Sequence, residues 1–454
     1  MDTRFDGTEG RPGLLETGRR HGGPGSTARI CLVGLGYVGL PLAVEFDAAG
    51  HRVTGFDLDE AKVGALARGI DTTGDLGDEA ISSSDVGFSA DPAAIEGADY
   101  VIIAVPTPID ENDQPDLGYV ADAGRTVGRW MSPGTTVVLE STVYPGATRE
   151  VLVPALAEAS GLEPGEEFFV GYSPERLTPG DPRHGLRDVV KIVSGETDEV
   201  LEDVAALYET IVEAGVHRAP TIEVAEAAKI VENVQRDVNI ALVNEFAMAF
   251  QRMADGLDWR AVLEAAGTKW NFHDYRPGLV GGHCIPVDPY FFTYQSKRAG
   301  FVPELTLAGR AVNESMPAHV ATRTIKALND HGKPLRGSRV LVLGLTYKPD
   351  VADTRMSKVA SVVDGLREYD ISVAGTDPYL DAATIREEFG IEPVPLGEFA
   401  GFDALLLATP HAAFRELDFA SVASQMNESP VLVDVVASLD ADRLAGSGLD
   451  YWSA

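Results

Sequence analysis

The feature that most constrains this chain is a short apolar run that ends in three spaced glycines. The run covers residues 28–33 and leads into Gly34-Leu-Gly36-Tyr-Val-Gly39, after which a helical pattern begins. An apolar run of this length before glycines predicts a buried strand and a tight turn into a helix. Units of this kind build parallel α/β sheets, so we expect the folded part to begin near residue 28.

Strand and helix patterns alternate as far as residue 220, which predicts a doubly wound α/β domain over residues 28–220. Helical patterns such as 40–49 and 117–131 separate the strands. The further strands that we expect are 52–57, 100–105, 135–140, 167–172 and 189–194.

The pattern changes at Thr221–Asp255, which has helical spacing and contains neither Gly nor Pro. Such a helix would be roughly 50 Å long, more than a globular domain ordinarily uses, so we expect one side of it to pack on a second copy of the chain. We assign residues 221–330 to a central helical domain. Further strand patterns at 339–345, 372–375, 404–408 and 431–435 predict a second, smaller α/β unit over residues 331–454.

The chain has 454 residues, with 70 acidic and 37 basic side chains and a formal net charge of −33. This acid excess argues against nucleic acid and against an anionic membrane surface as partners, because both require basic patches. Only nine of the basic residues are lysines. An acidic, lysine-poor surface is favoured in molar salt, where a Debye length of about 3 Å screens self-repulsion, so we hypothesise a salt-adapted source.

Two cysteines, Cys31 and Cys284, exclude a disulfide scaffold and a zinc site of four cysteines, and we expect no bound metal. Residues 1–27 lack the apolar core of a signal peptide, so we expect a disordered tail there. No apolar run approaches the roughly 18 residues of a membrane span. The expected location is therefore the cytoplasm.

The glycine turn has the spacing of a dinucleotide site. Gly34 allows the tight turn, Gly36 lets the backbone approach a pyrophosphate, and Gly39 lets the helix pack against the strand. Asp57 ends the next strand, where an acid can bind both ribose hydroxyls and favours NAD over NADP. Lys62, one helical turn further on, complicates that preference.

Hydroxyl side chains follow two other predicted strands of the first domain. Thr107 comes after the third strand, and Ser141 and Thr142 come after the fourth. Ligands of doubly wound sheets bind beyond the carboxyl ends of the strands, so these hydroxyls are placed for cofactor contacts. Local turn chemistry is an equally good explanation.

The long helix carries a polar stripe. Lys229 and Asn233 are four residues apart and therefore neighbours on one face, and Arg236 and Asn244 fall on the same side. A solvated helix face explains the stripe as well as a catalytic role does, although the scarcity of lysine favours a role for Lys229. The opposite arc is apolar and contains Ile230, Val231, Val234, Val238 and Ala241.

Cys284 lies in the segment Arg276-Pro-Gly-Leu-Val-Gly281-Gly-His-Cys-Ile-Pro-Val-Asp288-Pro. Glycines before it let other groups approach the backbone, and prolines after it stiffen the loop. This setting predicts a presented nucleophile, whereas Cys31, inside the first strand, fits an inert buried thiol. Lys229 is a better candidate than the adjacent His283 for stabilising charge near the sulfur or an oxyanion.

Taken together, the motifs resemble the UDP-glucose/GDP-mannose dehydrogenase family, the nucleotide-sugar 6-dehydrogenases, from about residue 28 to 454. Beyond the glycine turn, the motifs that carry the resemblance are Val105-Pro-Thr-Pro, Ser141-Thr-Val-Tyr-Pro-Gly, Ser173-Pro-Glu-Arg, Lys229-Ile-Val-Glu-Asn-Val-Gln-Arg-Asp-Val-Asn, Gly281-Gly-His-Cys-Ile-Pro-Val-Asp-Pro and Gly344-Leu-Thr-Tyr-Lys-Pro-Asp-Val-Ala-Asp-Thr-Arg. The resemblance implies two Rossmann-like domains joined by a central helical region, and a homodimer formed through the long helix. It also implies oxidation of a sugar C6 alcohol to a carboxylate with two NAD.

The resemblance implies a role for individual residues. Cys284 is the nucleophile, Lys229 and Asn233 stabilise the oxyanion, and Thr142, Glu175 and Asp288 transfer protons or position water. The cofactor positions are Gly34, Gly36, Tyr37, Val38, Gly39, Asp57, Lys62, Thr107, Ser141, Thr142 and Arg355. The substrate positions are Glu175, Arg176, Lys229, Asn233, Arg276, Gly281 and Lys348.

One departure from the family pattern bears on the substrate. UDP-glucose enzymes have a second glutamate soon after the first, and this chain has Pro179 there. With Lys269-Trp-Asn-Phe, this resembles the branch that acts on UDP-N-acetylglucosamine or its galacto epimer, closely followed by UDP-N-acetylmannosamine. The departure leaves Glu175 and Asp288 as the candidate hydrolytic bases. UDP-glucose 6-dehydrogenase, a two-electron β-hydroxyacid dehydrogenase and a non-catalytic NAD-sensing protein are the alternatives.

Overall fold

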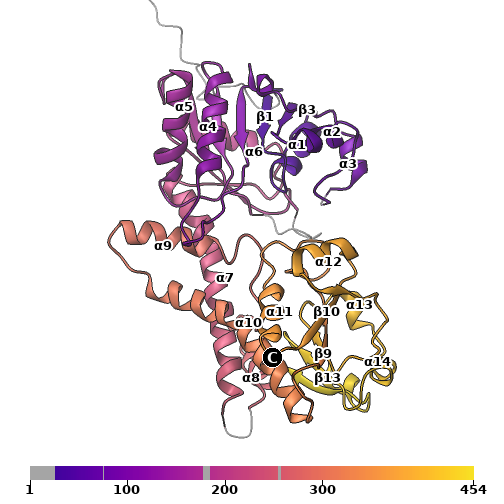
Figure 1. The fold of residues 1–454 in the computed structure, drawn as a ribbon. Coiled ribbons are helices and arrows are strands. Elements are labelled where there is room, and N and C mark those ends of the chain that lie inside the picture. The colour runs from indigo at the N-terminus through magenta and orange to yellow at the C-terminus, as the bar shows by residue number, and fades with distance from the viewer. Residues whose placement is uncertain (1–25, 75, 177–184, 254–256, 454) are drawn as a thin grey trace, which may run out of the picture. The chain divides into compact units, whose positions relative to one another are not determined.

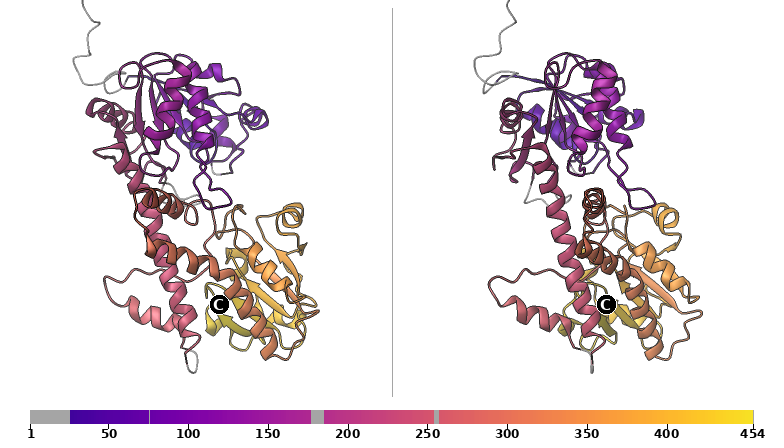
Figure 2. Two further views of the ribbon diagram at one scale, coloured as in Figure 1. Left: turned by 60° about the vertical axis from the view of Figure 1, so that its left-hand side comes forward. Right: turned by 90° about the vertical axis from the view of Figure 1, so that its left-hand side faces the viewer.

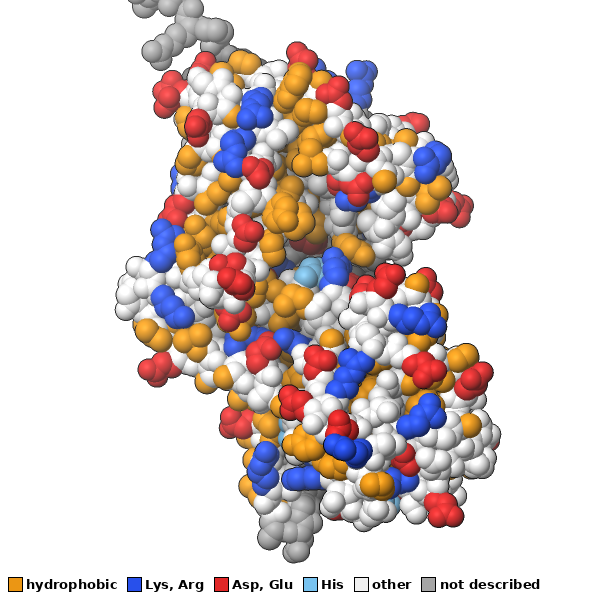
Figure 3. Space-filling view, viewed as in Figure 1, with side chains coloured by type: hydrophobic (Ala, Val, Ile, Leu, Met, Phe, Trp, Pro, Cys, Tyr) orange, Lys and Arg blue, Asp and Glu red, His pale blue; other side chains and the backbone are white. Residues whose placement is uncertain are grey.

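The computed structural model describes residues 26–74, 76–176, 185–253 and 257–453. The chain divides between Ile230 and Val231 into two compact units, each with its own parallel sheet. Nearly all of the expected N-terminal tail, and Pro179, lie outside the described residues. Figure 3 shows acidic and basic side chains interspersed over the visible surface of both units.

The first unit contains an eight-stranded sheet with the order β3-β2-β1-β4-β5-β6-β7-β8. All five strands expected after the glycine turn are present within one to three residues of their predicted bounds, and the sequence reading missed β3 and β8, which are short. The strands are β1 (Arg29–Val33), β2 (Arg52–Phe56), β3 (Gly87–Ser89), β4 (Tyr100–Ile103), β5 (Thr136–Leu139), β6 (Phe169–Tyr172), β7 (Lys191–Gly195) and β8 (Val216–Arg218).

The expectation of a wholly parallel first sheet is wrong at one pair, because β6 and β7 run antiparallel. A parallel pair needs a crossover of a dozen or more residues, usually a helix, and no helix is described between these two strands. As a result, Lys191, the first residue of β7, lies near Pro174, which follows β6.

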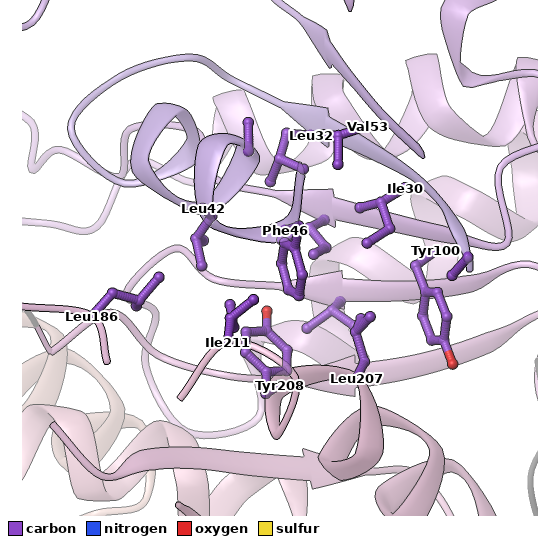
Figure 4. Packing of buried hydrophobic residues seen from close by; sticks show 14 of the residues in the cluster. Ile30, Leu32, Leu42, Phe46, Val53, Tyr100, Leu186, Leu207, Tyr208 and Ile211 are labelled. Carbon is purple, nitrogen blue, oxygen red and sulfur yellow. The ribbon is translucent and has the colours of Figure 1, made fainter. Parts of the chain in front are cut away.

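Helices cover both faces of the first sheet (Figures 1 and 2). On one face, Phe46 of the first helix packs edge-on against Tyr208 of the sixth at a centroid distance of 5.6 Å, over a core that includes Ile30 and Leu32 (Figure 4). The helices are α1 (Gly39–Ala48), α2 (Glu60–Leu66), α3 (Asp78–Ser82), α4 (Gly118–Trp130), α5 (Val153–Ser160) and α6 (Asp198–Tyr208), with a 3₁₀-helix at Pro92–Ile95 and a π-helix at Thr148–Leu152.

The long helix expected at Thr221–Asp255 is α7 (Ile222–Phe250). It ends earlier than predicted, since residues 251–253 form a turn or bend. Near its start, the buried Glu226 accepts hydrogen bonds from the backbone N–H groups of Gly146 and Thr148, at 2.5 and 2.9 Å, and from the Thr148 hydroxyl at 2.7 Å. Burial raises the pKa of Glu226 to about 7.

The second unit contains a six-stranded, wholly parallel sheet with the order β11-β10-β9-β12-β13-β14. The four strands predicted from sequence are present, and β11 and β14 at the two edges were missed. The elements are α8 (Trp259–Gly267), α9 (Asp288–Arg298), α10 (Glu304–Asp330), β9 (Arg339–Leu343), α11 (Val359–Arg367), β10 (Ser372–Thr376), α12 (Ala382–Phe389), β11 (Glu392–Pro393), β12 (Ala404–Leu407), α13 (Ala412–Arg415), α14 (Phe419–Gln425), β13 (Val431–Asp434), α15 (Ala441–Leu444) and β14 (Asp450–Ser453).

Both sheets share a strand order in which the first three strands lie to one side and the later strands to the other. This order creates a switch point between β1 and β4 in the first sheet and between β9 and β12 in the second. Ligands of doubly wound sheets bind beyond the carboxyl ends of the strands at such points. Each unit therefore offers one place where a nucleotide is expected.

Candidate functional site

The glycine turn lies at the switch point of the first sheet, and its three glycines have different surroundings. Gly34 has a φ of +95°, and a Cβ there would lie 2.6 Å from the carbonyl oxygen of Ala104. A Cβ on Gly39 would lie 1.8 Å from the carbonyl oxygen of Gly34. A Cβ on Gly36 would meet no atom within 4 Å, so the protein's own packing does not demand glycine there.

The open space at Gly36 fits the close approach of a pyrophosphate to the backbone. Helix α1 begins just after it with no side-chain cap, so its N-terminus is left for an anion. Tyr37 and Val38 are half-buried turn residues between the glycines. The residues of this turn therefore fit a dinucleotide cofactor.

Asp57 follows β2 and is tied to the same turn. Its carboxylate accepts the N–H of Leu35 at 2.9 Å and the ammonium of Lys62 at 2.8 Å. Burial alone would raise the pKa of Asp57, but the hydrogen bonds from Lys62, Asp59 and Leu35 hold it below its usual value. Asp57 is thus ionised at neutral pH, and Lys62 acts as its partner.

The hydroxyl residues beyond the neighbouring strands divide into two kinds. Ser141 is buried and donates to the carbonyl oxygen of Val105 at 2.6 Å, so it joins the loops that follow β4 and β5. Thr107 and Thr142 are half-buried. The geometry supports local turn chemistry for Ser141 and leaves the two threonines as contact candidates.

Glu175 follows β6 and lies beside a buried cluster that the sequence reading missed. The Lys191 ammonium is 2.7 Å from the Glu140 carboxylate, 2.9 Å from the Pro174 carbonyl oxygen and 3.8 Å from the Glu175 carboxylate. The Tyr208 hydroxyl also donates to Glu140. Burial raises the pKa of Glu140 to about 7, against the attraction of Lys191. Lys191 thus lies between two carboxylates, one of which is a predicted catalytic group.

Arg176, the next residue, donates to the carbonyl oxygen of Val190 at 2.5 Å. This bond joins the loop after β6 to the start of β7, which gives Arg176 a structural role beside its predicted contact with substrate.

The polar stripe of α7 is buried, so its interpretation as a solvated face is wrong for three of its four residues. Lys229, Asn233 and Asn244 are 8%, 7% and 0% exposed. Arg236 is exposed and does not belong to this buried set. Part of the opposite arc faces solvent instead, with Val231 at 59% exposure. A buried polar stripe requires partners, and the cysteine loop supplies several of them.

Two asparagines of α7 hold the cysteine loop at its two ends. Asn244 accepts the N–H of Gly278 at 2.8 Å and donates to the carbonyl oxygen of the same residue at 3.1 Å. Asn233 donates to the carboxylate of Asp288 at 2.5 Å. Cys284 lies between these anchors, and its carbonyl oxygen accepts the N–H of Asp288 at 2.8 Å as α9 begins.

The middle of the cysteine loop packs against Tyr347. This residue follows the turn at Gly344-Leu345, which comes after β9 of the second sheet. A Cβ on Gly281 would lie 2.9 Å from the Cβ of Tyr347, and a Cβ on Gly282, whose φ is +83°, would lie 2.8 Å from its ring. Glycine is therefore required at both positions. Cys284 itself is half-buried, whereas Cys31 is buried in β1 with its pKa raised by desolvation to about 12.

A pocket opens at the switch point of the second sheet. It is lined by residues after β9, β12 and β13, including Thr346, Tyr347, Thr409 and Val436, together with Gly281 of the cysteine loop. Lys348 is half-buried in the same stretch as Tyr347. The structure thus brings Gly281 and the segment that carries Lys348 together within the second unit.

Two predicted arginines are engaged by neighbouring carboxylates. Arg355 binds Asp353 through two hydrogen bonds of 2.9 and 2.6 Å. Arg276 is 2.9 Å from Asp274 in an exposed ion pair. Such pairs contribute little to stability and can exchange for a phosphate, so both remain contact candidates.

Within the described residues, no group of three or more His, Cys, Asp or Glu side chains is arranged to hold a metal ion. No helix in the described part of the chain combines the length and apolar character needed to cross a membrane.

The predicted residues fall into two groups, one in each compact unit. The glycine turn, Asp57, Lys62, Thr107, Ser141, Thr142, Glu175, Arg176 and Lys229 belong to the first, and Asn233, Arg276, Gly281, Cys284, Asp288, Lys348 and Arg355 belong to the second. The sequence did not single out two buried polar residues, Lys191 and His411, and it offered Asn244 only as a member of the polar stripe of α7. The scarcity of lysine was an available signal for Lys191, and nothing in the sequence pointed to His411.

Comparisons with known proteins agree with the expectation of one nucleotide site in each unit. Three profiles of the UDP-glucose/GDP-mannose dehydrogenase family match: its NAD binding domain over residues 28–212, its central domain over 223–315 and its UDP binding domain over 341–441. A UDP-N-acetyl-D-glucosamine 6-dehydrogenase of Pseudomonas aeruginosa is 44% identical over 91% of this chain and 98% of its own.

Solved structures of the same kind also superpose well. A UDP-D-ManNAc dehydrogenase from Pyrococcus horikoshii has a TM-score of 0.85 and 30% identity, and covers 94% of this chain and 98% of its own. A UDP-glucose dehydrogenase from Pyrobaculum islandicum has a TM-score of 0.81 and 28% identity, with 97% and 99% coverage. The chain therefore belongs to the UDP-glucose/GDP-mannose dehydrogenase family and is an NAD-dependent nucleotide-sugar dehydrogenase.

Proposed function

We propose that this enzyme oxidises the C6 alcohol of a UDP-N-acetylhexosamine to the carboxylate through a covalent intermediate on Cys284. The observation that carries the proposal is the setting of Cys284. Its loop is anchored at both ends by asparagines of α7 and rests on Tyr347 through two glycines. A thiol held in this way is pre-organised for attack, unlike the inert Cys31.

The chemistry removes four electrons from C6. NAD accepts one hydride in each of two oxidations. The first oxidation removes a hydride from C6 and a proton from O6, which leaves an aldehyde. The sulfur of Cys284 adds to this carbonyl carbon, the thiol proton passes to a base, and the C=O π pair moves onto O6, which gives the thiohemiacetal as its oxyanion. Loss of the second hydride gives a thioester, and water then breaks the C–S bond and releases the acid.

The protein groups have separate tasks in this scheme. Lys229 and Asn233, one turn apart on α7, stabilise the negative oxygen of the thiohemiacetal. Thr142 and Glu175 transfer protons, and Asp57 binds the ribose of the cofactor. Lys348, Arg355 and Arg276 supply positive charge to the phosphates of two polyanionic ligands.

Glu175 is the better candidate for the base that activates the hydrolytic water. The Asp288 carboxylate is 3% exposed and already accepts the Asn233 amide, so it has less freedom to move a proton. Glu175 is more accessible, with a side-chain exposure of 14%, and has a cation 3.8 Å away. Asp288 is then a residue that orients Asn233.

UDP-N-acetylglucosamine is the first substrate to test, followed by its galacto epimer and UDP-N-acetylmannosamine. The 44% identity to an enzyme named for UDP-N-acetylglucosamine supports this order, as does Pro179 in place of a second glutamate. UDP-glucose is the alternative. We assign residues 28–220 to NAD binding, 221–330 to the cysteine loop and dimerisation, and 331–454 to UDP-sugar binding in the formation of glycan precursors.

We further propose a homodimer formed through α7. Apolar side chains of this helix are exposed in the single chain, with Val231 at 59%, Leu242 at 47% and Phe246 at 38%. Such a stripe is typical of a protein interface. A catalytic cysteine outside any disulfide also fits a reducing compartment such as the cytoplasm. Sedimentation of Leu242→Asp, which we expect to be monomeric, against Glu245→Gln, which we expect to stay dimeric, tests the interface.

Counting NADH per sugar tests the activity. We expect about two NADH per uronate for the preferred sugar, because the oxidation removes four electrons. A ratio of one would favour a two-electron β-hydroxyacid dehydrogenase, and no turnover with any of four UDP-sugars would favour an NAD-sensing protein. Cys284→Ala should bind UDP-sugar and yield no acid. Normal acid formation by that variant would exclude the covalent route.

A further inference from the structure

The second sheet repeats the acid of the dinucleotide fingerprint, with a buried histidine as its side-chain partner where Asp57 has Lys62. Asp377 follows β10 as Asp57 follows β2, and it accepts the N–H of Leu345 at 2.7 Å as Asp57 accepts that of Leu35. Asp377 is 7% exposed and also accepts the N–H of Tyr379 at 2.8 Å. The remaining space at its carboxylate is occupied by His411, whose Nε2 is 3.0 Å away.

His411 is completely buried and has both ring nitrogens engaged. Its Nδ1 accepts the backbone N–H of Asp350 at 2.8 Å, so the ring proton is on Nε2, which donates to Asp377. Tyr379 and Phe414 cover the ring, at centroid distances of 5.0 and 5.5 Å. A side chain in such a setting cannot reorient without losing two buried hydrogen bonds.

The segment that His411 holds is short and conformationally unusual. Asp350 has a φ of +61°, a left-handed conformation that an L-residue adopts only when its surroundings fix it. Its carboxylate accepts the N–H of Ala412 at 2.8 Å. Thr346, at the other end, donates to the carbonyl oxygen of Lys348 at 2.9 Å and has its own carbonyl bonded by Thr409 at 2.6 Å.

This segment, residues 346–350, carries two groups that the proposed reaction uses. Lys348 is the cation assigned to the diphosphate, and Tyr347 is the surface on which Gly281 and Gly282 of the cysteine loop rest. A displacement of the segment would therefore move the cation and the support of Cys284 together.

We propose that His411 is a positioning residue that holds residues 346–350 in place through its hydrogen bonds to Asp350 and Asp377. The role of Lys348 in this inference rests on the proposed function.

The test compares His411→Leu, which removes both ring bonds, with His411→Asn, whose carboxamide oxygen can still accept the N–H of Asp350. His331→Leu is the matched control, since His331 lies in the same unit at the end of α10, bonded to the carbonyl of Ala327. UDP and NAD binding are measured by calorimetry on the full chain, with hydrogen exchange of residues 346–350.

We expect His411→Leu to weaken UDP binding by at least tenfold, with a matching rise in KM for the UDP-sugar and faster exchange of residues 346–350. NAD affinity should stay within twofold. His411→Asn should recover part of the UDP affinity, and His331→Leu should bind like wild type. Unchanged UDP affinity and exchange in a folded His411→Leu would overturn the proposal.

If His411→Leu fails to fold, Asp377→Ala supplies the same test, because it removes the carboxylate that accepts the Nε2–H of His411. Its UDP affinity should fall likewise, and wild-type affinity would refute the positioning role. These binding measurements need no turnover. Failure of the proposed activity, seen as no NADH from any UDP-sugar, is therefore distinguishable from failure of the role of His411.

Discussion

Replacing Asn244 by leucine should destabilise the second unit strongly, although the two side chains have the same branching and the same number of heavy atoms. Asn244 is fully buried and makes two bonds to the backbone of Gly278, at 2.8 and 3.1 Å, and one to the side chain of Asn313 at 2.9 Å. Leucine would leave three buried polar partners without these bonds. At about 1 kcal/mol for each, the expected loss is about 3 kcal/mol.

The effect is measurable as a shift in melting temperature. For a unit of this size, about 1 kcal/mol lowers the melting temperature by 2–4 °C, so Asn244→Leu should melt about 6–12 °C below wild type. The cysteine loop would lose one of its two anchors, so we also expect acid formation to slow. Differential scanning calorimetry resolves the unfolding of the second unit, and initial rates report the activity.

Asn239→Leu is the matched control on the same helix. Its amide bonds only to the carbonyl oxygen of Gln235, one turn earlier on α7, and it is half-buried. Its melting temperature should stay within about 2 °C of wild type, because surface changes seldom exceed about 0.5 kcal/mol. If Asn244→Leu melts as Asn239→Leu does, the anchoring role of the buried stripe is refuted.

Four further perturbations follow from the contacts. Burial and nearby cations lower the pKa of His319 to about 4. Between pH 6.5 and 4 the unfolded chain therefore binds a proton that the folded chain does not, and the free energy of unfolding should fall by up to roughly 2 kcal/mol from pH 7 to pH 5. His319→Gln should flatten this pH dependence in thermal melts. Lys191→Met should cost about 3–5 kcal/mol in urea unfolding by leaving buried carboxylates uncompensated, and adding Glu140→Gln should recover part of that loss. Asp57→Asn should raise the Kd for NAD about tenfold by calorimetry, and an unchanged Kd would remove Asp57 from the cofactor site. Raising KCl from low to molar concentration should raise the melting temperature or activity if the charge of −33 reflects a salty habitat, and a steady fall in both would contradict it.

The sequence predicted those parts of the fold that depend on local pattern. The glycine turn, the central strands of both sheets and the buried Cys31 follow from short-range hydrophobicity and turn chemistry. The short edge strands β3, β8 and β11 were missed because two or three residues carry too weak a pattern. The antiparallel pairing of β7 with β6 was missed because a local pattern predicts a strand but not its direction.

Residues of the candidate site were predictable where a single motif contains the relevant side chains. They were not predictable where two segments far apart in the sequence form the contact. Cys284 and Asp57 stand in recognisable local settings. Asn244 and His411 act through Gly278 and Asp350, residues 34 and 61 positions away. Such pairs form only when the chain folds, and the sequence around a single Asn or His does not indicate which residue it will contact. The buried side of α7 was misjudged for the same reason.

The hydrogen bonds of the Glu226 carboxylate hold the start of α7 against residues 146–148 of the first unit. Surface ion pairs such as Arg187–Glu45, at 2.8 Å, weaken as salt rises, since mobile ions compete for both charges. The side chain of Glu226 is fully buried, so water and salt ions do not reach its three hydrogen bonds. The start of α7 is therefore held to residues 146–148 by contacts whose strength depends little on ionic strength.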